Sequence, residues 1–367
     1  MGSNVFLQLA AAAAAAVPDL ELISVGGPHH SDGHWAETVL MDTTGSYYSV
    51  LAAKTPEAQM KLTAAQTITK ALRRVIQKSS FPYQLPNYLG TVKGTLGLVT
   101  VMRQLPGAGL QAELLSCDLA TNIGKAIATI HELPRELVQD LNIPAHDAAE
   151  VREHLFTEID QAARTSRIPA TLLNRWEHQL ENISMWQFAS CIIHGDLTDA
   201  ALLHRGDSIT AIDNWHDLAL GDPAADLAWL IAAMPEEFQG DFLHGYRQVR
   251  TTKPDDALLD RALLMSEIAL ARWLMYGVRH EDAEVIADAE SMLHTLAREV
   301  GDDRQLGPNA PEVTLAEPWV DTPPNGNQPA GKGPVVPDDQ DDSPRSDSSR
   351  YDSVPPVFDE NSDNARQ

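Results

Sequence analysis

Two aspartates, each placed directly after a short apolar run, constrain the fold of this chain more than any other feature. Cys191-Ile192-Ile193 predicts a short buried strand, and His194-Gly195-Asp196 follows as a turn in which glycine supplies backbone freedom. Seventeen residues after Asp196, Asp213 ends a second apolar run. Residues 201–204 and 209–212 predict the two strands of a hairpin between these aspartates. Such a hairpin is a rigid way to hold two carboxylates in one cleft.

A pair of carboxylates in one cleft suits phosphoryl transfer from a nucleotide. One carboxylate accepts the proton of the attacking hydroxyl, and the other holds the Mg²⁺ ion that bridges the phosphates. The sequence makes Asp196 and Asp213 the candidates for this pair.

Three motifs in this order resemble the aminoglycoside/macrolide phosphotransferase family, and in particular its actinobacterial macrolide-phosphotransferase-like branch. They are His194-Gly195-Asp196-Leu197, Ile212-Asp213 and the run from Gly221 to Ala228. The likeness extends to Leu105-Pro106-Gly107 and to Ile130–Pro134. The resemblance implies an α+β protein of two lobes with the protein-kinase-like fold.

The same resemblance divides the chain into three parts. Residues 1–103 are expected to form a small lobe of sheet plus one long helix, and residues 104–300 a large helical lobe with the catalytic and metal loops. Residues 301–367 hold 11 of the 23 prolines and many acids, which predicts a disordered tail. We expect the tail to be a solvated tether. The alternatives are a docking segment for a protein partner at Val354–Phe358 and a phosphorylated serine cluster near Ser343 to Ser353.

The family resemblance also assigns roles to single residues. Asp196 would be the catalytic aspartate, Asp213 the Mg²⁺ ligand, and His194 a brace of the catalytic loop. Met102 to Gln104 would form the hinge that meets the purine ring of ATP or GTP. The implied reaction is Mg²⁺- and nucleotide-dependent phosphorylation of a hydroxyl on a small-molecule acceptor, antibiotic-like or metabolite.

Near the two aspartates, the chain departs from the family pattern. Ala201 stands where the family has a second metal ligand, and a methyl group cannot coordinate a metal. Asp199 and His204 are nearby substitutes, although we expect Asp199 to face solvent and Mg²⁺ prefers oxygen over histidine nitrogen. Asn214 is one residue more than the family usually has here, and it either bulges outward or rotates Asp213 away from the metal.

The amino-terminal lobe departs from the pattern as well. The strand at Tyr47–Ala52 should carry the phosphate-binding lysine, but Leu51 holds that position and Lys54 follows three residues later. The helix at Pro56–Gln77 should offer a glutamate to pair with the lysine, and Ala65 holds that position. Two hypotheses follow: a slow phosphotransferase, or a catalytically degenerate module that binds nucleotide or a partner.

The sequence suggests two possible roles for Asp222, a helix N-cap or a part in substrate binding. Gly-Asp-Pro before an apolar helix is an ordinary N-cap with proline in the first turn, and this is favoured over a role in substrate binding.

Composition narrows the possible partners. The formal net charge of −25 opposes binding to nucleic acid or to an anionic membrane, and it suits a cationic small molecule. The only two cysteines, Cys117 and Cys191, stand far apart without a motif, which indicates buried thiols in a reducing, cytoplasmic compartment.

Helical patterns mark both ends of the two predicted lobes. The alanine-rich stretch Val5–Val17 is too short to span a bilayer and is expected to form a short amphipathic helix packed on the small lobe. Apolar residues between Leu258 and Trp273 recur at three- and four-residue steps, so Met265 and Trp273 are expected to fill the core.

Overall fold

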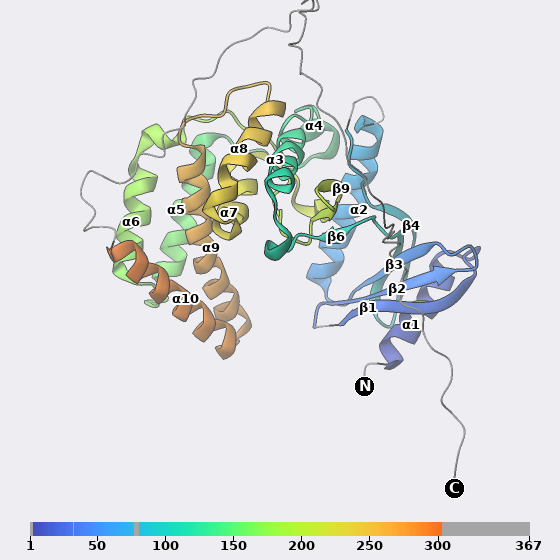
Figure 1. The fold of residues 1–367 in the computed structure, drawn as a ribbon. Coiled ribbons are helices and arrows are strands. Elements are labelled where there is room, and N and C mark those ends of the chain that lie inside the picture. The colour runs from blue at the N-terminus through green and yellow to red at the C-terminus, as the bar shows by residue number, and fades with distance from the viewer. Residues whose placement is uncertain (1–2, 32, 77–80, 303–367) are drawn as a thin grey trace, which may run out of the picture. The chain divides into compact units, whose positions relative to one another are not determined.

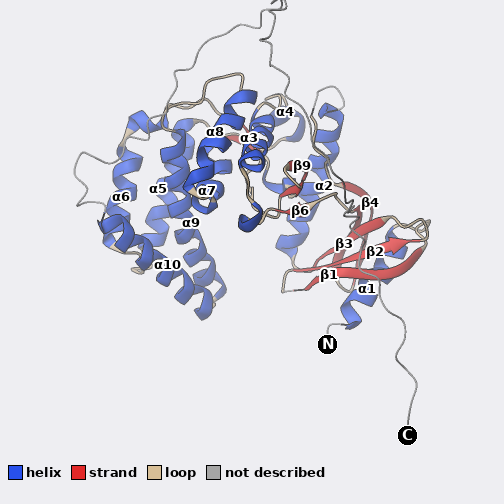
Figure 2. Ribbon diagram, in the orientation of Figure 1, coloured by secondary structure: helices blue, strands red, loops and turns tan. Residues whose placement is uncertain are grey.

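The computed structural model describes residues 3–31, 33–76 and 81–302. The predicted tail, its docking segment at Val354–Phe358 included, lies almost wholly outside these residues, which end at Asp302. Figures 1 and 2 show the chain passing from a sheet-rich amino-terminal part into a part made mainly of helices, as the kinase-like resemblance implies.

The amino-terminal part is a five-stranded antiparallel sheet in the order β1-β2-β3-β5-β4 with a helix on each face. Its strands are β1 (Leu22–Ser31), β2 (Trp35–Asp42), β3 (Tyr47–Ala53), β4 (Asn87–Gly94) and β5 (Gly97–Arg103). Helices α1 (Ser3–Ala16) and α2 (Pro56–Ile76) complete this part.

Alternation along β3 explains why the sheet needs two helices. Val50 and Ala52 face one side, where they pack in a cluster with Leu9 and Ala13 of α1. Leu51 faces the other side and packs against a cluster that contains Leu62 of α2. The predicted helix on the small lobe is therefore confirmed as α1.

The remaining described residues form the helical part and two small sheets. The helices are α3 (Cys117–His131), α4 (Leu137–Leu141), α5 (Ala148–Ala163), α6 (Ala170–Glu181), α7 (Ala224–Ala233), α8 (Glu236–Val249), α9 (Leu258–His280) and α10 (Ala283–Asp302), with 3₁₀ turns η1 (Ala112–Leu114), η2 (Ile183–Trp186) and η3 (Trp215–Asp217). One sheet joins β6 (Ala108–Gly109), β8 (Leu202–Arg205) and β9 (Ser208–Ile212), and the other pairs β7 (Cys191–Ile193) with β10 (Ala219–Gly221).

Two side chains differ from their predicted environment. Cys117 is exposed at the first position of α3, so only Cys191 is a buried thiol. Met265 lies in the core, but Trp273 is 39% exposed and donates from its indole nitrogen to Asp288 of α10. Helical spacing places a residue on one stripe of a helix, but it does not say how far a neighbouring helix covers that stripe. None of the described helices is both long and apolar enough to cross a membrane.

Candidate active site

The loop His194–Asp196 begins where the buried strand β7 ends. Gly195 adopts a φ of +88°, which favours glycine, and a Cβ there would lie 2.2 Å from the backbone oxygen of Asp217. The loop can therefore approach the Asp217 turn only because residue 195 has no side chain. The carboxylate of Asp196, which is 41% exposed, is left open to solvent.

His194 links the two aspartate loops through its ring. Its Nε2 lies 2.7 Å from the carbonyl oxygen of Asp213, and the backbone N–H of Asp196 donates to its Nδ1 at 3.4 Å. Burial lowers the pKa of His194, which keeps the ring neutral, and a neutral ring can donate at Nε2 and accept at Nδ1. The ring stands between the backbones of Asp196 and Asp213, so each loop fixes the position of the other.

The carboxylate of Asp226, in α7, holds the same loop through hydrogen bonds to its backbone. Its two carboxylate oxygens accept the backbone N–H groups of His194 at 2.7 Å and Gly195 at 2.9 Å, and Nε2 of the buried His131 lies 3.1 Å from one of them. Burial alone would raise the pKa of Asp226, but the hydrogen bond and charge of His131, together with the loop amide, outweigh it and lower the pKa. Asp226 is thus a buried anion whose hydrogen bonds are satisfied by the His194–Asp196 loop and by His131.

Asp213 follows β9, in the hairpin that the sequence predicts. Its backbone N–H donates to the carbonyl of Ala201 at 2.9 Å, and its Oδ1 accepts the N–H of Asn214 at 2.8 Å. Asn214, the extra residue, adopts a left-handed conformation with a φ of 62° and precedes the turn η3. Burial raises the pKa of Asp213. The nearby charge of Asp213 adds to the effect of burial in raising the pKa of Tyr88.

Among Asp213 and the residues around Ala201, only Asp213 has the chemistry that the Mg²⁺ site of the family needs. A half-buried carboxylate whose pKa is raised by burial is stabilised by a cation, and Mg²⁺ commonly takes one or two carboxylates alongside substrate phosphates. Asp213 fits that requirement. Ala201 is fully buried and offers only a methyl group. The exposed Asp199 bonds the next backbone N–H, and Nδ1 of His204 lies 2.8 Å from the Gly206 carbonyl in the hairpin turn.

A residue that the sequence reasoning missed lies beside Asp196. His216, in η3, places its Nε2 3.3 Å from a carboxylate oxygen of Asp196 and 3.4 Å from one of Asp217. The sequence offers only His216-Asp217, two residues after the extra Asn214, as a sign of this contact. No local pattern predicts it, because the closeness of η3 to Asp196 depends on the turn at Gly195.

An apolar contact lies where the family pattern expects a lysine–glutamate pair. Leu51 packs with the cluster that contains Ala58 and Leu62, and Ala65 is buried. The ammonium group of Lys54 donates to Oγ of Ser31, at the end of β1, at 2.8 Å. Position 51 and Lys54 therefore have different surroundings: Leu51 packs against the cluster that contains Leu62 of α2, and Lys54 contacts the end of β1.

The predicted hinge, Met102 to Gln104, comprises the last two residues of β5 and the residue after the strand. Met102 is buried, and Gln104 is exposed immediately after the strand. The backbone N–H of Gln104 donates to the carbonyl of Tyr47 at 3.0 Å, which ties the hinge to the start of β3.

Asp222 does more than cap a helix. One of its carboxylate oxygens accepts the N–H of Ala224, the first residue of α7, at 2.9 Å, although the N-cap position itself is Pro223 and not Asp222 as predicted. The buried guanidinium of Arg261 also donates to both of its oxygens, at 2.7 and 3.1 Å, and to Asp255. Burial lowers the pKa of Arg261, but the hydrogen bonds to Asp255 and Asp222 outweigh it and raise the pKa. This ion pair fixes the start of α7, which carries Asp226.

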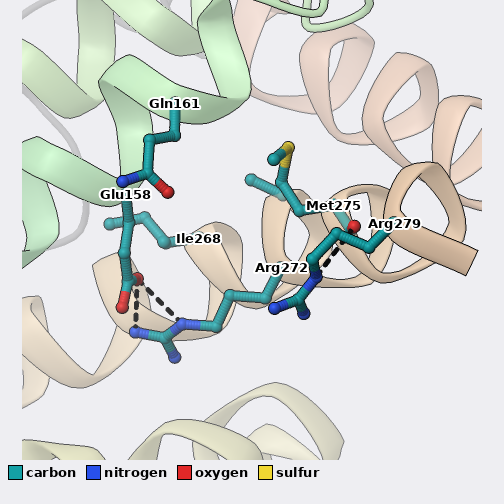
Figure 3. A pocket seen from close by; sticks show the side chains of 7 residues that line it. Glu158, Gln161, Ile268, Arg272, Met275 and Arg279 are labelled. Carbon is teal, nitrogen blue, oxygen red and sulfur yellow. Dashed lines mark hydrogen bonds and ion pairs between the residues drawn. The ribbon is translucent and has the colours of Figure 1, made fainter.

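Two pockets lie between α5 and α9. One, of about 190 Å³, is lined by Gly195 of the His194–Asp196 loop and reaches Glu158 and Arg272. The second, of about 300 Å³, shares Glu158 and Arg272 and continues to Met275 and Arg279. Figure 3 shows the Glu158–Arg272 ion pair, whose nitrogen–oxygen distances are 2.8 and 2.9 Å, on the wall of the second pocket. This pair therefore stands where the two pockets adjoin.

The fold combines an antiparallel sheet and its long helix with a mainly helical part, and two loops of the helical part carry Asp196 and Asp213. This combination defines a phosphotransferase of the protein-kinase-like class. Residues 30–262, more than half of the chain, match the phosphotransferase enzyme family, and the chain belongs to that family. It is an enzyme of the kinase type.

Individual relatives support the same class. Viomycin phosphotransferase of Streptomyces vinaceus is 25% identical over 290 residues, which cover 73% of this chain and 93% of the relative. Among solved structures, the macrolide 2′-phosphotransferase of Brachybacterium faecium has a TM-score of 0.64 at 18% identity, covering 80% of this chain and 97% of its own. A phosphotransferase solved with GDP and kanamycin has a TM-score of 0.64 at 16% identity, covering 82% and 99%. These structural likenesses concern the fold.

Proposed function

We propose that the protein transfers the terminal phosphoryl group of a nucleoside triphosphate to a hydroxyl group of a small molecule. The observation that carries the proposal is the shared framework of the two aspartates. His194 bonds the backbone of both aspartate loops, while Asp226 fixes the His194 loop from α7. This arrangement supports a single reaction centre built from Asp196 and Asp213.

In this proposal, Asp196 accepts the proton of the acceptor hydroxyl. The hydroxyl oxygen forms a bond to the γ-phosphorus, the bond from that phosphorus to the bridging oxygen breaks, and a nucleoside diphosphate leaves. The exposure of Asp196 supports this role because an acceptor can reach its carboxylate. His194 would brace the loop so that the carboxylate is held in place.

Asp213 is the residue that would hold Mg²⁺. When bound, the ion supplies charge that stabilises the transferred phosphoryl group. With Ala201 fully buried, we propose that Asp213 alone provides the protein carboxylate of that site. Met102, Gln104 and Lys54 are proposed to contact the nucleotide, ATP or GTP, with Met102 and Gln104 at the purine.

The apolar contact of Leu51 supports a slow reaction. A preorganised donor that is missing from a phosphoryl-transfer site costs about 10²- to 10³-fold in rate. Such groups act as a unit, so the loss of a lysine–glutamate pair counts as one deficit rather than two. Family membership and the two retained aspartates weigh against the catalytically degenerate alternative.

The pocket beside Gly195 is the proposed acceptor site, since an acceptor placed there adjoins the Asp196 loop. The named relatives act on viomycin and on macrolides, which supports an antibiotic-like acceptor or a metabolite with a free hydroxyl. The net charge of −25 supports an acceptor that carries positive charge. We further propose a cytoplasmic location, which the two unpaired cysteines support.

A turnover assay tests the proposal. The full chain is incubated with Mg²⁺, ATP or GTP, and a panel of viomycin-type, macrolide and aminoglycoside acceptors, and diphosphate release is measured. Asp196→Ala is expected to abolish acceptor-dependent release. Asp199→Ala is the matched control because it removes an exposed carboxylate three residues further along the same segment. Equal turnover in wild type and Asp196→Ala would refute the role of Asp196.

A further inference from the structure

Three potential metal ligands converge beside the catalytic loop. Asp196, His216 and Asp217 each offer one ligand atom, and these atoms lie within 4.8 Å of one another. The side chain of His216 is only 12% exposed, whereas those of Asp196 and Asp217 are 41% and 52% exposed. A buried imidazole nitrogen thus points toward two carboxylates that remain open to solvent.

The His216 nitrogen lies near both carboxylates but is not hydrogen-bonded to them. Its Nε2 atom is buried and has no hydrogen-bond partner, although the two oxygens are 3.3 and 3.4 Å away. In a tetrahedral zinc site with bonds of about 2.0–2.1 Å, neighbouring ligand atoms are about 3.3 Å apart. The ion-pair distances from His216 Nε2 to the two carboxylates, 3.3 and 3.4 Å, match the ligand spacing that one such metal ion requires.

The backbone holds the three side chains in this arrangement without help from a ligand. The two loops meet where Gly195 contacts the Asp217 carbonyl. This contact requires glycine, because any Cβ at residue 195 would lie 2.2 Å from that oxygen. On the other side, the N–H of His216 donates to the carbonyl of Asn214 at 2.8 Å, which fixes the turn that presents the imidazole. The site is therefore formed in advance.

We propose that Asp196, His216 and Asp217 bind a first-row transition metal ion, with Zn²⁺ as the probe of choice. One imidazole nitrogen and two carboxylates leave a fourth position for water, which is the ligand count of an open zinc site. The histidine disfavours Mg²⁺, which prefers oxygen ligands and octahedral geometry. This site is separate from the carboxylate of Asp213.

A consequence follows if the proposed function holds, since this step rests on it. A metal ion bound to Asp196 occupies the carboxylate that would accept the acceptor's proton. Micromolar Zn²⁺ is therefore expected to inhibit phosphoryl transfer in the presence of excess Mg²⁺, and removal of Zn²⁺ by a chelator is expected to restore it.

A binding titration tests the site without any need for turnover. The full chain, without a polyhistidine tag, is stripped of metal and titrated with Zn²⁺ against a chromophoric chelator. One site is expected, and His216→Ala and Asp217→Asn should each weaken it at least about tenfold. Co²⁺ bound in the same place should give the visible absorption of a four-coordinate ion.

His178→Ala is the matched control, because it removes an exposed histidine of α6 by the same substitution. It should leave the affinity for Zn²⁺ unchanged. Melting curves of all variants in chelator establish that each is folded. Equal affinity in wild type and His216→Ala, or no uptake of Zn²⁺ below about 100 μM, would overturn the site.

Inhibition is then measured for each variant relative to its own activity without Zn²⁺. Wild type and His178→Ala should be inhibited, and His216→Ala should resist at the same Zn²⁺ concentration. Full turnover by wild type with the site occupied would overturn the blocked-carboxylate consequence. If no variant turns over even without Zn²⁺, the proposed function fails, while the binding titration still decides the metal site.

Discussion

Replacing Asp226 by asparagine should damage both the stability and the turnover of the enzyme. The carboxylate accepts the backbone N–H groups of His194 and Gly195 through different oxygens, and His131 lies 3.1 Å from one of them. Asparagine has one oxygen, so its NH₂ group must face a donor that the carboxylate had satisfied. An unsatisfied buried donor costs about 1–3 kcal/mol, and the lost charge on the retained bond adds to this. We therefore expect Asp226→Asn to lower the free energy of unfolding by about 2–4 kcal/mol.

That change corresponds to a fall in Tm of about 5 °C for a domain of this size. Turnover should fall by about 10²-fold, because displacement of the His194 loop also displaces the Asp196 carboxylate. A misplacement of about 1 Å is enough for a loss of that size. Differential scanning calorimetry and the diphosphate-release assay measure the two effects. Asp160→Asn, on the exposed face of α5, is the matched control. Asp226→Asn with the Tm and turnover of this control would refute the proposed role of Asp226.

The pH dependence gives an independent check on Asp226. Its pKa in the folded protein is lowered, so the folded state binds this proton less readily than the unfolded chain. The stabilisation is therefore present above the unfolded carboxylate pKa of about 3.9 and is lost as the pH falls through the folded value. Wild type should lose stability in this acid range more steeply than Asp226→Asn, as measured by urea unfolding. Parallel curves would contradict the assignment.

Three further substitutions separate function from stability. Because burial raises the pKa of Asp213, its ionised form costs stability as the pH rises, so Asp213→Asn should keep or raise the Tm at pH 7 while turnover is lost; a marked fall in Tm would argue against this. Arg261→Met leaves the buried Asp222 without its guanidinium and should cost about 3–5 kcal/mol in urea unfolding, whereas a loss below about 1 kcal/mol would show that the pair is dispensable. Gly195→Ala should lower both Tm and turnover, since its φ is +88° and a Cβ would lie 2.2 Å from the Asp217 carbonyl; unchanged values would mean that the two loops can separate freely.

The local parts of the fold were predictable from the sequence because they depend on short-range patterns. The strand expected at Tyr47–Ala52 is β3, and the helix expected at Pro56–Gln77 is α2, each within one residue at its end. The hairpin that carries Asp213 also follows from alternation and turn residues alone. Their positions in the chain can be predicted from local patterns, although β3 also pairs with the distant strand β5.

The rest of the site depends on contacts between distant segments. Arg261 meets Asp222 across 39 residues, and no local pattern pairs them. His216 reaches Asp196 because Gly195 allows one loop to touch another. Closeness in the chain to Ala201 made Asp199 and His204 the predicted substitute ligands. The residues that meet Asp196 are instead His216 and Asp217, in the turn after Asp213 that packs against α2.

The most direct test of a shared reaction centre is a crystal structure of the full chain with Mg²⁺ and a non-hydrolysable ATP or GTP analogue. We expect a metal ion on the Asp213 carboxylate beside the phosphates, with the Asp196 carboxylate facing the γ-phosphate. The purine should lie against the Met102–Gln104 hinge. Phosphates bound away from both aspartates, or a γ-phosphate that Asp196 cannot face, would contradict the claim that the two carboxylates serve one reaction centre.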